Sequence, residues 1–273
     1  MAQDFEFDKN SGKAVPSFIG ELKLSKGLLK KKVANSNLAV TKGTKFYKTD
    51  TLITENSSLA RILMIDESIL TIGANSEFHF SQFEFKDKEN RNSIYELIKG
   101  QTRAHIKNKA KEGDIQFKTT FTSLGVRGTE FLINLQKLKD MEIIEFALLN
   151  GEVNITTDKK EEFHLSKEDH LILVRDSKGA SAYEKIKLSE NMIEQLNIED
   201  SLLPYLNIKN LDISSKLYKL VNNITETTGS TSSSSPSEET KNLKDDTGPA
   251  WEKNLKKLND HLKENQKKNK NEF

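Results

Sequence analysis

The chain has no cysteine among its 273 residues. This absence excludes disulfide bonds, thiol catalysis, zinc sites built from cysteine and a lipidated N-terminal cysteine. It does not identify the cellular compartment, because a chain without cysteine is tolerated in either redox environment. Tryptophan is nearly absent too, with one residue, so an aromatic platform for a sugar would have to come from tyrosine or phenylalanine.

Long apolar runs and an excess of one charge are also missing. The longest apolar runs have four residues, as in Ile62–Ile65, whereas a membrane-spanning helix needs roughly 20. The 42 basic and 41 acidic residues give a net charge of +1, which does not favour nucleic acid as a partner. We therefore expect no membrane span and no nucleic-acid binding.

The first residues, MAQDFEFDKN, lack the basic segment and apolar core of a signal peptide. The letters AQD would suit the mature end of an exported protein, with Met1 added for expression. The alternative is a cytoplasmic start. We expect the exported case, with the signal peptide absent from this sequence.

Short alternating apolar runs between residues 18 and 187 predict β-strands. In FHFSQFEF, residues 78–85, the aromatic side chains change faces partway, which indicates a bulge or a strongly twisted strand. In MEIIEFALLNGEVNITTD, residues 141–158, Asn150-Gly151 predicts a hairpin with a type I′ turn. RNSIYELIKGQ, residues 91–101, fits either one helical turn or a strand.

Glycines at positions 43, 73, 100, 125 and 151 are spaced 25 to 30 residues apart. This spacing favours a repeating unit of two short strands, as in a solenoid. The side chains around these glycines are not self-similar, so an irregular all-β domain fits equally well.

Helical patterns follow the strands. Ser189 is expected to cap a short helix that holds Met192, Ile193 and Leu196, and Pro204 ends any continuous helix. A Ser/Thr-rich stretch without apolar residues predicts a disordered linker. Beyond it, one apolar stripe on a terminal helix would bind a partner helix, lie on a membrane surface, or dock on its own domain. The stripe consists of Trp251, Leu255, Leu258 and Leu262.

Residues that could carry chemistry are scattered. The sequence has no H-x-H, H-E-x-x-H, G-x-S-x-G, G-x-G-x-x-G or phosphate-loop motif. His164 and His170 could form a metal pair, but surface or hairpin histidines are the more common outcome. Adjacent carboxylates such as Asp66-Glu67 would point to opposite faces of a strand, which disfavours a shared acid/base site. We therefore expect no catalytic residue, no metal and no cofactor.

FKTTFTSLGVRGTEFLINLQ, residues 117–136, is predicted as a buried strand that contains two charges. In a regular strand Arg127 would face apolar neighbours and would need a buried partner. If Gly128 forms a bulge, Arg127 and Glu130 fall on one side and pair. The sequence thus predicts a structural role for Arg127, whose loss would cost roughly 3–5 kcal/mol. The alternative is an arginine that binds a ligand through several oxygens.

The same stretch resembles the signature of the FecR domain, the periplasmic module of ferric-dicitrate-type sensor proteins. The family's G-V-R-G-T-x-F core is present, and three other segments are similar to family segments in the same order. These segments are ENSSLARILMIDESILTIGANSEFHF, YELIKGQTRAHI and LLNGEVNI, and the match covers about residues 18–187. The residues of the structural signature are Gly125, Val126, Arg127, Gly128, Thr129, Glu130 and Phe131.

The resemblance implies an extracytoplasmic, all-β domain, either a twisted solenoid-like sheet assembly or an irregular β-sandwich, with no assigned catalytic residues. In the best-known members this domain belongs to a transmembrane anti-sigma regulator. This sequence shows neither the cytoplasmic helical region nor the membrane span of that plan, and it looks closer to free-standing members.

We therefore expect a non-enzymatic periplasmic protein that binds a protein or an envelope ligand, in signalling or regulation. A module that binds peptidoglycan or another glycan is the first alternative, and an enzyme is the second. The expected parts are a flexible N-terminus (1–17), the FecR-type β-domain (18–187), a short helical extension (188–223), the disordered linker (224–248) and the amphipathic terminal helix (249–273). Partner binding through this terminal helix is part of the prediction.

Overall fold

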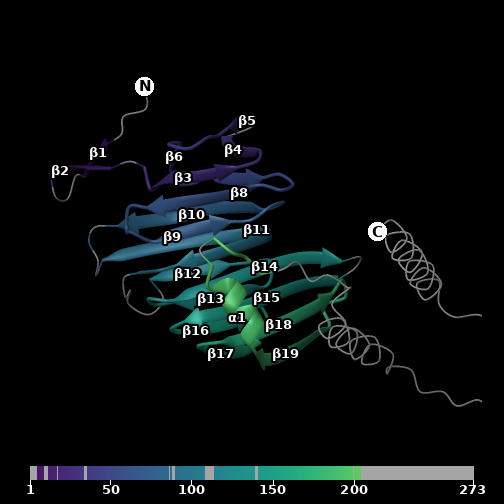
Figure 1. Cartoon of the computed structure of the whole chain (residues 1–273). Helices are drawn as coiled ribbons and strands as arrows, with labels where there is room; N and C mark the ends of the chain where they lie inside the picture. Colours follow the sequence, from purple (N-terminus) through teal and green to yellow (C-terminus); the bar gives the residue numbers. More distant parts are fainter. Residues whose placement is uncertain are drawn as a thin grey trace, which may run out of the picture. The chain divides into compact units, whose positions relative to one another are not determined.

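The structure is a computed structural model of the whole chain. It describes residues 5–8, 12–16, 18–33, 36–85, 87, 90–107, 114–138, 141–198 and 200–203. Apart from one short helix, the elements in this part of the chain are β-strands. The predicted all-β class is confirmed, and Figure 1 shows the strands stacked from β3 to β19 in nearly the order of the sequence.

The strands form two sheets that share one long strand. The order in sheet I is β5 (Ser36–Ala39), β4 (Leu29–Val33), β7 (Thr51–Thr54), β10 (Glu77–Phe85), β11 (Arg91–His105), β12 (Ile115–Lys118), β13 (Thr122–Val126), β16 (Glu152–Thr157) and β17 (Glu162–Ser166). The order in sheet II is β6 (Lys45–Phe46), β3 (Gly20–Lys26), β8 (Leu59–Met64), β9 (Ile69–Ile72), β11, β14 (Glu130–Leu138), β15 (Met141–Asn150), β18 (Asp169–Asp176) and β19 (Ser181–Lys187). A separate antiparallel pair consists of β1 (Phe5–Asp8) and β2 (Lys13–Pro16).

Strand β11 passes from one sheet to the other at Gly100. Up to Lys99 it pairs with β10 in sheet I, and from Gly100 onward it pairs with β14 in sheet II. Gly100 has φ +88°, and a Cβ at this position would lie 2.5 Å from the Cα of Ser76. Only glycine fits this corner, because it tolerates positive φ and lets the two backbones approach. The RNSIYELIKGQ segment is therefore a strand, not a helical turn.

The main hydrophobic core lies between the two sheets. Aromatic rings run through it from β10 and β11 of sheet I to β14 of sheet II, with neighbouring centroids about 5–6 Å apart. Such tilted and edge-on pairs stabilise a core beyond their buried area. The rings in this chain of contacts are Phe80, Phe78, Tyr95, Phe117 and Phe131.

The bulge predicted in FHFSQFEF is confirmed. The register between β10 and β11 shifts between Phe80 and Gln82, so Ser81 is the extra residue. The shift brings Phe83 to the core beside Phe78 and Phe80, and all three rings are buried. A change of aromatic faces within a strand was a sufficient local signal for this irregularity.

The hairpin predicted at Asn150-Gly151 is wrong. Strand β15 pairs with β14 and β18 in sheet II, whereas β16 pairs with β13 and β17 in sheet I. Gly151 has φ +89°, as a turn glycine should, but Asn150 does not have the positive φ that a type I′ turn requires. The dipeptide instead carries the chain from one sheet to the other, because both strands must contribute apolar faces to the same core.

The helix predicted after residue 187 is confirmed as α1 (Glu190–Leu196), and the Ser189 side chain accepts a hydrogen bond from the Met192 amide. The chain divides into two compact units, residues 1–231 and 232–273, and the described residues all lie in the first. The predicted linker, the terminal helix and its stripe of Trp251, Leu255, Leu258 and Leu262 lie outside the described residues. Among the residues that the structure describes, no helix has the length and apolar character needed to cross a membrane.

Candidate ligand-binding groove and C-terminal docking site

The signature stretch is a crossing between the two sheets, not one continuous strand. Strand β13 ends at Val126 in sheet I, residues 127–129 form a turn, and β14 begins at Glu130 in sheet II. Gly128 has φ +61° within this turn. The prediction of a single buried strand is therefore wrong, although both flanking strands contribute to the core.

The two charges of the stretch are separated by this crossing. Arg127 is exposed on the turn, whereas Glu130 accepts hydrogen bonds from Arg103 of β11 at 2.9 and 2.6 Å. Neither predicted environment of Arg127, an apolar face or a pair with Glu130, is present. The buried signature residues are Val126, Thr129 and Phe131. They hold the crossing in place and leave the guanidinium group in solvent.

A second crossing packs against the first. A Cβ at Gly151 would lie 2.7 Å from Cγ2 of Thr129 and 3.1 Å from the carbonyl oxygen of Gly128. The two sheet crossings therefore touch, and a side chain at position 151 would separate them. This contact fixes the position of Arg127 relative to β16.

An open groove of about 810 Å³ lies beside the crossings, over β12, β13, β16 and β17 of sheet I. Strand register explains its shape. Gln116, Gly125, Asn154 and His164 form one row across the four strands. Gly125 has no side chain, and a Cβ built there would meet no atom within 4 Å. The row therefore has a gap between Gln116 and Asn154, and this gap is the middle of the groove. The groove is lined by Gln116, Ser123, Gly125, Val126, Arg127, Gly128, Gly151, Glu152, Val153, Asn154, Thr156 and His164.

The groove offers hydrogen bonds and, at Arg127, an exposed positive charge. Its polar side chains are amides, hydroxyls, an imidazole, the Glu152 carboxylate and the Arg127 guanidinium group, and Nδ1 of His164 lies 2.9 Å from Oδ1 of Asn154. Arg127 lies at the groove with its donors in solvent, and a guanidinium group can bind a carboxylate through two parallel hydrogen bonds. This arrangement suits a polar ligand that carries amide, hydroxyl or carboxylate groups.

Four residues of the signature predicted from the sequence line this groove: Gly125, Val126, Arg127 and Gly128. The signature motif did not identify the lining residues on β12, β16 and β17, because these residues reach the groove only through pairing between distant segments. The only local signal is an outward-facing series of small or polar residues, and a solvated strand face gives the same pattern.

The histidines do not form the metal pair that was considered as an alternative. His164 is exposed on β17 beside Asn154, whereas His170 is buried on β18 with its Nε2 3.3 Å from Oε1 of Glu145. Asn134 donates to the other carboxylate oxygen of Glu145 at 2.6 Å. Within the described part of the chain, no three His, Asp or Glu side chains come together as metal ligands.

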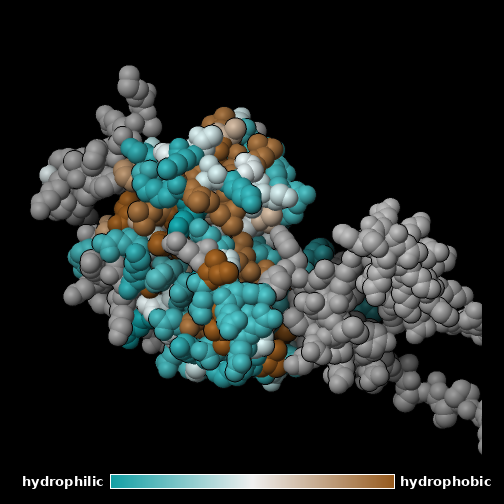
Figure 2. Space-filling view, in the orientation of Figure 1, coloured by the Kyte–Doolittle hydropathy of each residue, from teal (hydrophilic) through white to brown (hydrophobic). Residues whose placement is uncertain are grey.

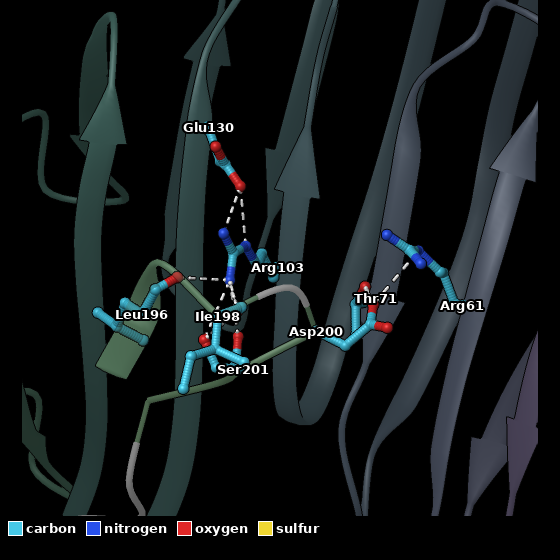
Figure 3. A network of polar contacts seen from close by, with 8 residues as sticks. All are labelled: Arg61, Thr71, Arg103, Glu130, Leu196, Ile198, Asp200 and Ser201. Atoms are coloured by element: carbon cyan, nitrogen blue, oxygen red, sulfur yellow. Dashed lines mark hydrogen bonds and ion pairs between the residues drawn. The ribbon is translucent and has the colours of Figure 1, made fainter. Parts of the chain in front are cut away.

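The C-terminal segment, residues 188–203, docks on the outer face of sheet II. Its buried leucines pack against Leu132 of β14 and Ala147 of β15. These leucines are Leu188, Leu196 and Leu203. At the end of α1, Nη1 of Arg103 donates to the carbonyl oxygens of Leu196, Ile198 and Ser201 at 2.8, 3.1 and 3.2 Å (Figure 3).

Asp200 anchors the same segment at a second point. Its Oδ1 accepts a hydrogen bond from Oγ1 of Thr71 at 3.0 Å and lies 3.3 Å from Nε of Arg61. Figure 3 shows Asp200 between these two side chains, and Arg103 between Glu130 and the end of α1. We call the surface formed by Arg61, Thr71, Arg103, Glu130, Leu132 and Ala147 the docking site.

Two sheets around one core, with a polar groove at their crossings, define an all-β domain. The model of the family described as FecR protein matches residues 50–154, from the start of β7 into β16. The resemblance seen in the sequence is confirmed for this range. The match includes the signature and most of the groove, and it covers less than half of the chain.

Two crystal structures of a candidate anti-sigma factor from Parabacteroides distasonis ATCC 8503 are similar to this chain, each with 11% identity. The first likeness has a TM-score of 0.42 and covers 54% of this chain and 62% of the other. The second has a TM-score of 0.44 and covers 63% of this chain and 74% of the other. The chain thus spans less than two thirds of the first of these structures. No curated protein matches the chain.

The match to this family suggests a regulatory or signalling role for the chain.

Proposed function

We propose that this chain is a non-catalytic periplasmic protein that binds a protein or an envelope ligand in the groove of sheet I. Binding would serve signalling or regulation. One observation carries the proposal: the FecR signature supplies both the gap at Gly125 and the exposed guanidinium group of Arg127, and both belong to the same groove. The signature thus has a binding role in addition to its role in the sheet crossing.

The chemistry of the groove favours a peptide-like ligand over a sugar. Amide and hydroxyl side chains match the hydrogen-bonding groups of a peptide backbone, and Arg127 matches a carboxylate. Sugar sites commonly add an aromatic ring that stacks on the sugar face, and no aromatic residue lines this groove within the described residues. Binding of peptidoglycan or another glycan is therefore the second candidate, supported by the hydroxyl and amide groups alone.

The proposal includes a second contact through the C-terminal helix. Residues 224–248 would act as a tether, and the stripe of Trp251, Leu255, Leu258 and Leu262 would bind a partner helix. The support is the sequence pattern: one apolar stripe on a helix whose other faces are polar.

Photo-crosslinking from the edge of the groove tests the proposal. A photoreactive phenylalanine analogue replaces the exposed Glu152 of β16, which lines the groove, in the native host, and a matched control carries it at the exposed Lys32 of β4, outside the groove. We expect an adduct of defined mass from position 152 that is absent at position 32. The adduct should disappear when Arg127→Ala is added. Equal adducts at both positions, or an adduct that does not depend on Arg127, would refute the groove as the binding site.

The compartment needs its own experiment. Fractionation of the native product should place it in the periplasm or outside the cell. Recovery in the cytosol alone would contradict the periplasmic proposal and leave the groove experiment unaffected.

A further inference from the structure

Helix α1 depends on sheet II for its order. It has seven residues, fewer than the roughly 12–15 at which an isolated helix becomes marginally stable. Its first turn contains the acidic Glu190, but its last turn contains no basic residue. Arg103 of β11 supplies a positive charge at that end from the sheet, where it complements the helix dipole and the free carbonyl groups.

The docking site combines a small apolar centre with a charged rim. Leu132 and Ala147 form the centre, and they contact the leucines of the C-terminal segment. The side chains of Arg103 and Glu130 at the rim are 11% and 21% exposed. Interfaces that open and close in solution have this anatomy, because the rim is easily hydrated.

Removal of the segment would leave no buried charge without a partner. Arg103 and Glu130 would keep their own ion pair and would gain water in place of the carbonyl groups. The ion pair of Asp66 and Arg91 differs, because each side chain is only 1% exposed. Neither of these charges can reach water unless the domain unfolds. The contact between segment and sheet is therefore reversible in a way that the core is not.

We propose that the docking site is an interaction surface for a helix C-terminus followed by an acidic residue, and that the chain's own segment 188–203 occupies it in cis as a releasable latch. In the docked state the segment holds residue 203, after which the chain continues, at sheet II. In the released state both sheets stay folded, the part of the chain after residue 203 gains reach, and the docking site is free. In the docked state the outward surface of α1 is mostly hydrophilic, as Figure 2 shows.

Hydrogen exchange of the full chain, read by mass spectrometry, tests the latch. The informative amides are those of Ile193, Asn197 and Ser201, whose hydrogen bonds lie within the segment. We expect them to exchange at least about tenfold faster than the amides of β14 and β15 in the same molecule. Arg103→Met should raise their exchange about tenfold further and leave the sheet unchanged, because a charge-assisted set of hydrogen bonds is lost.

Two further variants make the result specific. Asp200→Ala removes the second anchor of the segment and should raise exchange in the same way by a smaller factor. Arg175→Met is the matched control, because Arg175 is likewise an ion-paired arginine of a sheet II strand, bound to the carboxylates of Glu142 and Asp158, but its ion pairs do not involve the segment. It should leave exchange in the segment unchanged.

Three results would overturn the latch. The segment and the sheet could exchange at the same rate in the unchanged protein, which would make the segment part of the core. Arg103→Met and Arg175→Met could have equal effects on the segment. Light scattering could show a dimer that exchanges its segments, which would place the occupant in trans.

Discussion

Asp66 and Arg91 form an ion pair sealed inside the domain, with 3.0 Å between Oδ2 and Nη1 and 1% exposure of each side chain. Asp66→Ala would remove the carboxylate that compensates the charge of the buried guanidinium group, so we expect a loss of about 3–5 kcal/mol in the free energy of unfolding. Urea denaturation measures it. The control is Glu21→Ala, which removes the exposed pair with Lys23 and should cost less than about 1 kcal/mol. Equal losses in both variants would contradict the buried role.

Three glycine-to-alanine changes should give a graded series of stabilities. At Gly100, alanine meets positive φ and the backbone of Ser76, so we expect a loss of more than about 3 kcal/mol. At Gly43, φ is +91° but the space is open, so only the backbone cost of about 1–2 kcal/mol remains. Gly125 is in open space without positive φ, and its change should stay within about 0.5 kcal/mol. Thermal denaturation of the three variants checks the order, and a large loss at Gly125 would contradict it.

Arg127→Ala should leave the free energy of unfolding within about 0.5 kcal/mol of the unchanged protein, since the side chain is exposed on a turn. This expectation replaces the larger loss predicted from the sequence. Gly125→Trp should fill the gap in the groove with equally little effect on stability, and both changes should abolish ligand binding. A denaturant melt beside a binding assay separates the two effects. Loss of stability in parallel with loss of binding would restore a structural role for the arginine.

Asp169 should make stability depend on acid pH. Its burial alone would raise the pKa, but hydrogen bonds from Lys187, from the Ser166 amide and from Lys185 outweigh burial and lower the pKa from 3.8 to about 2. A lowered pKa stabilises the folded state above about pH 4, and this contribution disappears as the pH falls toward 2. Asp169→Asn should therefore lose about 1–2 kcal/mol at pH 7, a value reduced because both lysines are partly exposed.

The measurement for Asp169 is a pair of denaturation series from pH 7 to pH 2. The unchanged protein and Asp169→Asn should differ at neutral pH and converge near pH 2. A constant difference over the whole range would show that the asparagine changes packing and not the charge interaction.

Deletion of residues 224–273 should leave the cooperative melt of the β-domain nearly unchanged. A helix of about 20 residues with one narrow apolar stripe is marginal by itself and adds little to the domain. Deletion from Leu188 onward should instead lower the melting temperature, because Leu132 and Ala147 lose the leucines that cover them. Calorimetry of both truncated proteins checks the contrast. A large drop for the shorter deletion would make the terminal helix part of the core.

Local sequence patterns predicted what depends on neighbours in the chain. The change of aromatic faces around Ser81 gave the bulge of β10, and Ser189 gave the start of α1. The same kind of pattern failed at Asn150-Gly151, where a turn signal marked a crossing between sheets. A positive φ at one glycine fits both a hairpin turn and a crossing between sheets. Which of the two forms depends on the pairing partners of the flanking strands, and these partners are distant in the sequence.

In the candidate groove, too, the sequence predicted the residues of a local motif and missed those that only strand pairing brings together. The motif identified Gly125 and Arg127, but it assigned Arg127 to a buried strand, because alternation counts residues and cannot detect that the chain leaves one sheet for the other. Gln116, Asn154 and His164 become neighbours of Gly125 only through cross-strand register. Arg103 likewise meets the end of α1 across more than 90 positions of sequence, which no short motif records.

The nearly sequential order of strands in both sheets has a consequence for how the chain is built. Beyond β11, each new strand of either sheet adds to an edge formed by an earlier one, from β12 to β17 in sheet I and from β14 to β19 in sheet II. The domain can therefore assemble in the direction of synthesis, because each strand that has joined a sheet offers an open edge with which the next strand can pair. Segment 188–203 comes last among the described residues, and it packs on a surface of sheet II whose strands all precede it in the sequence.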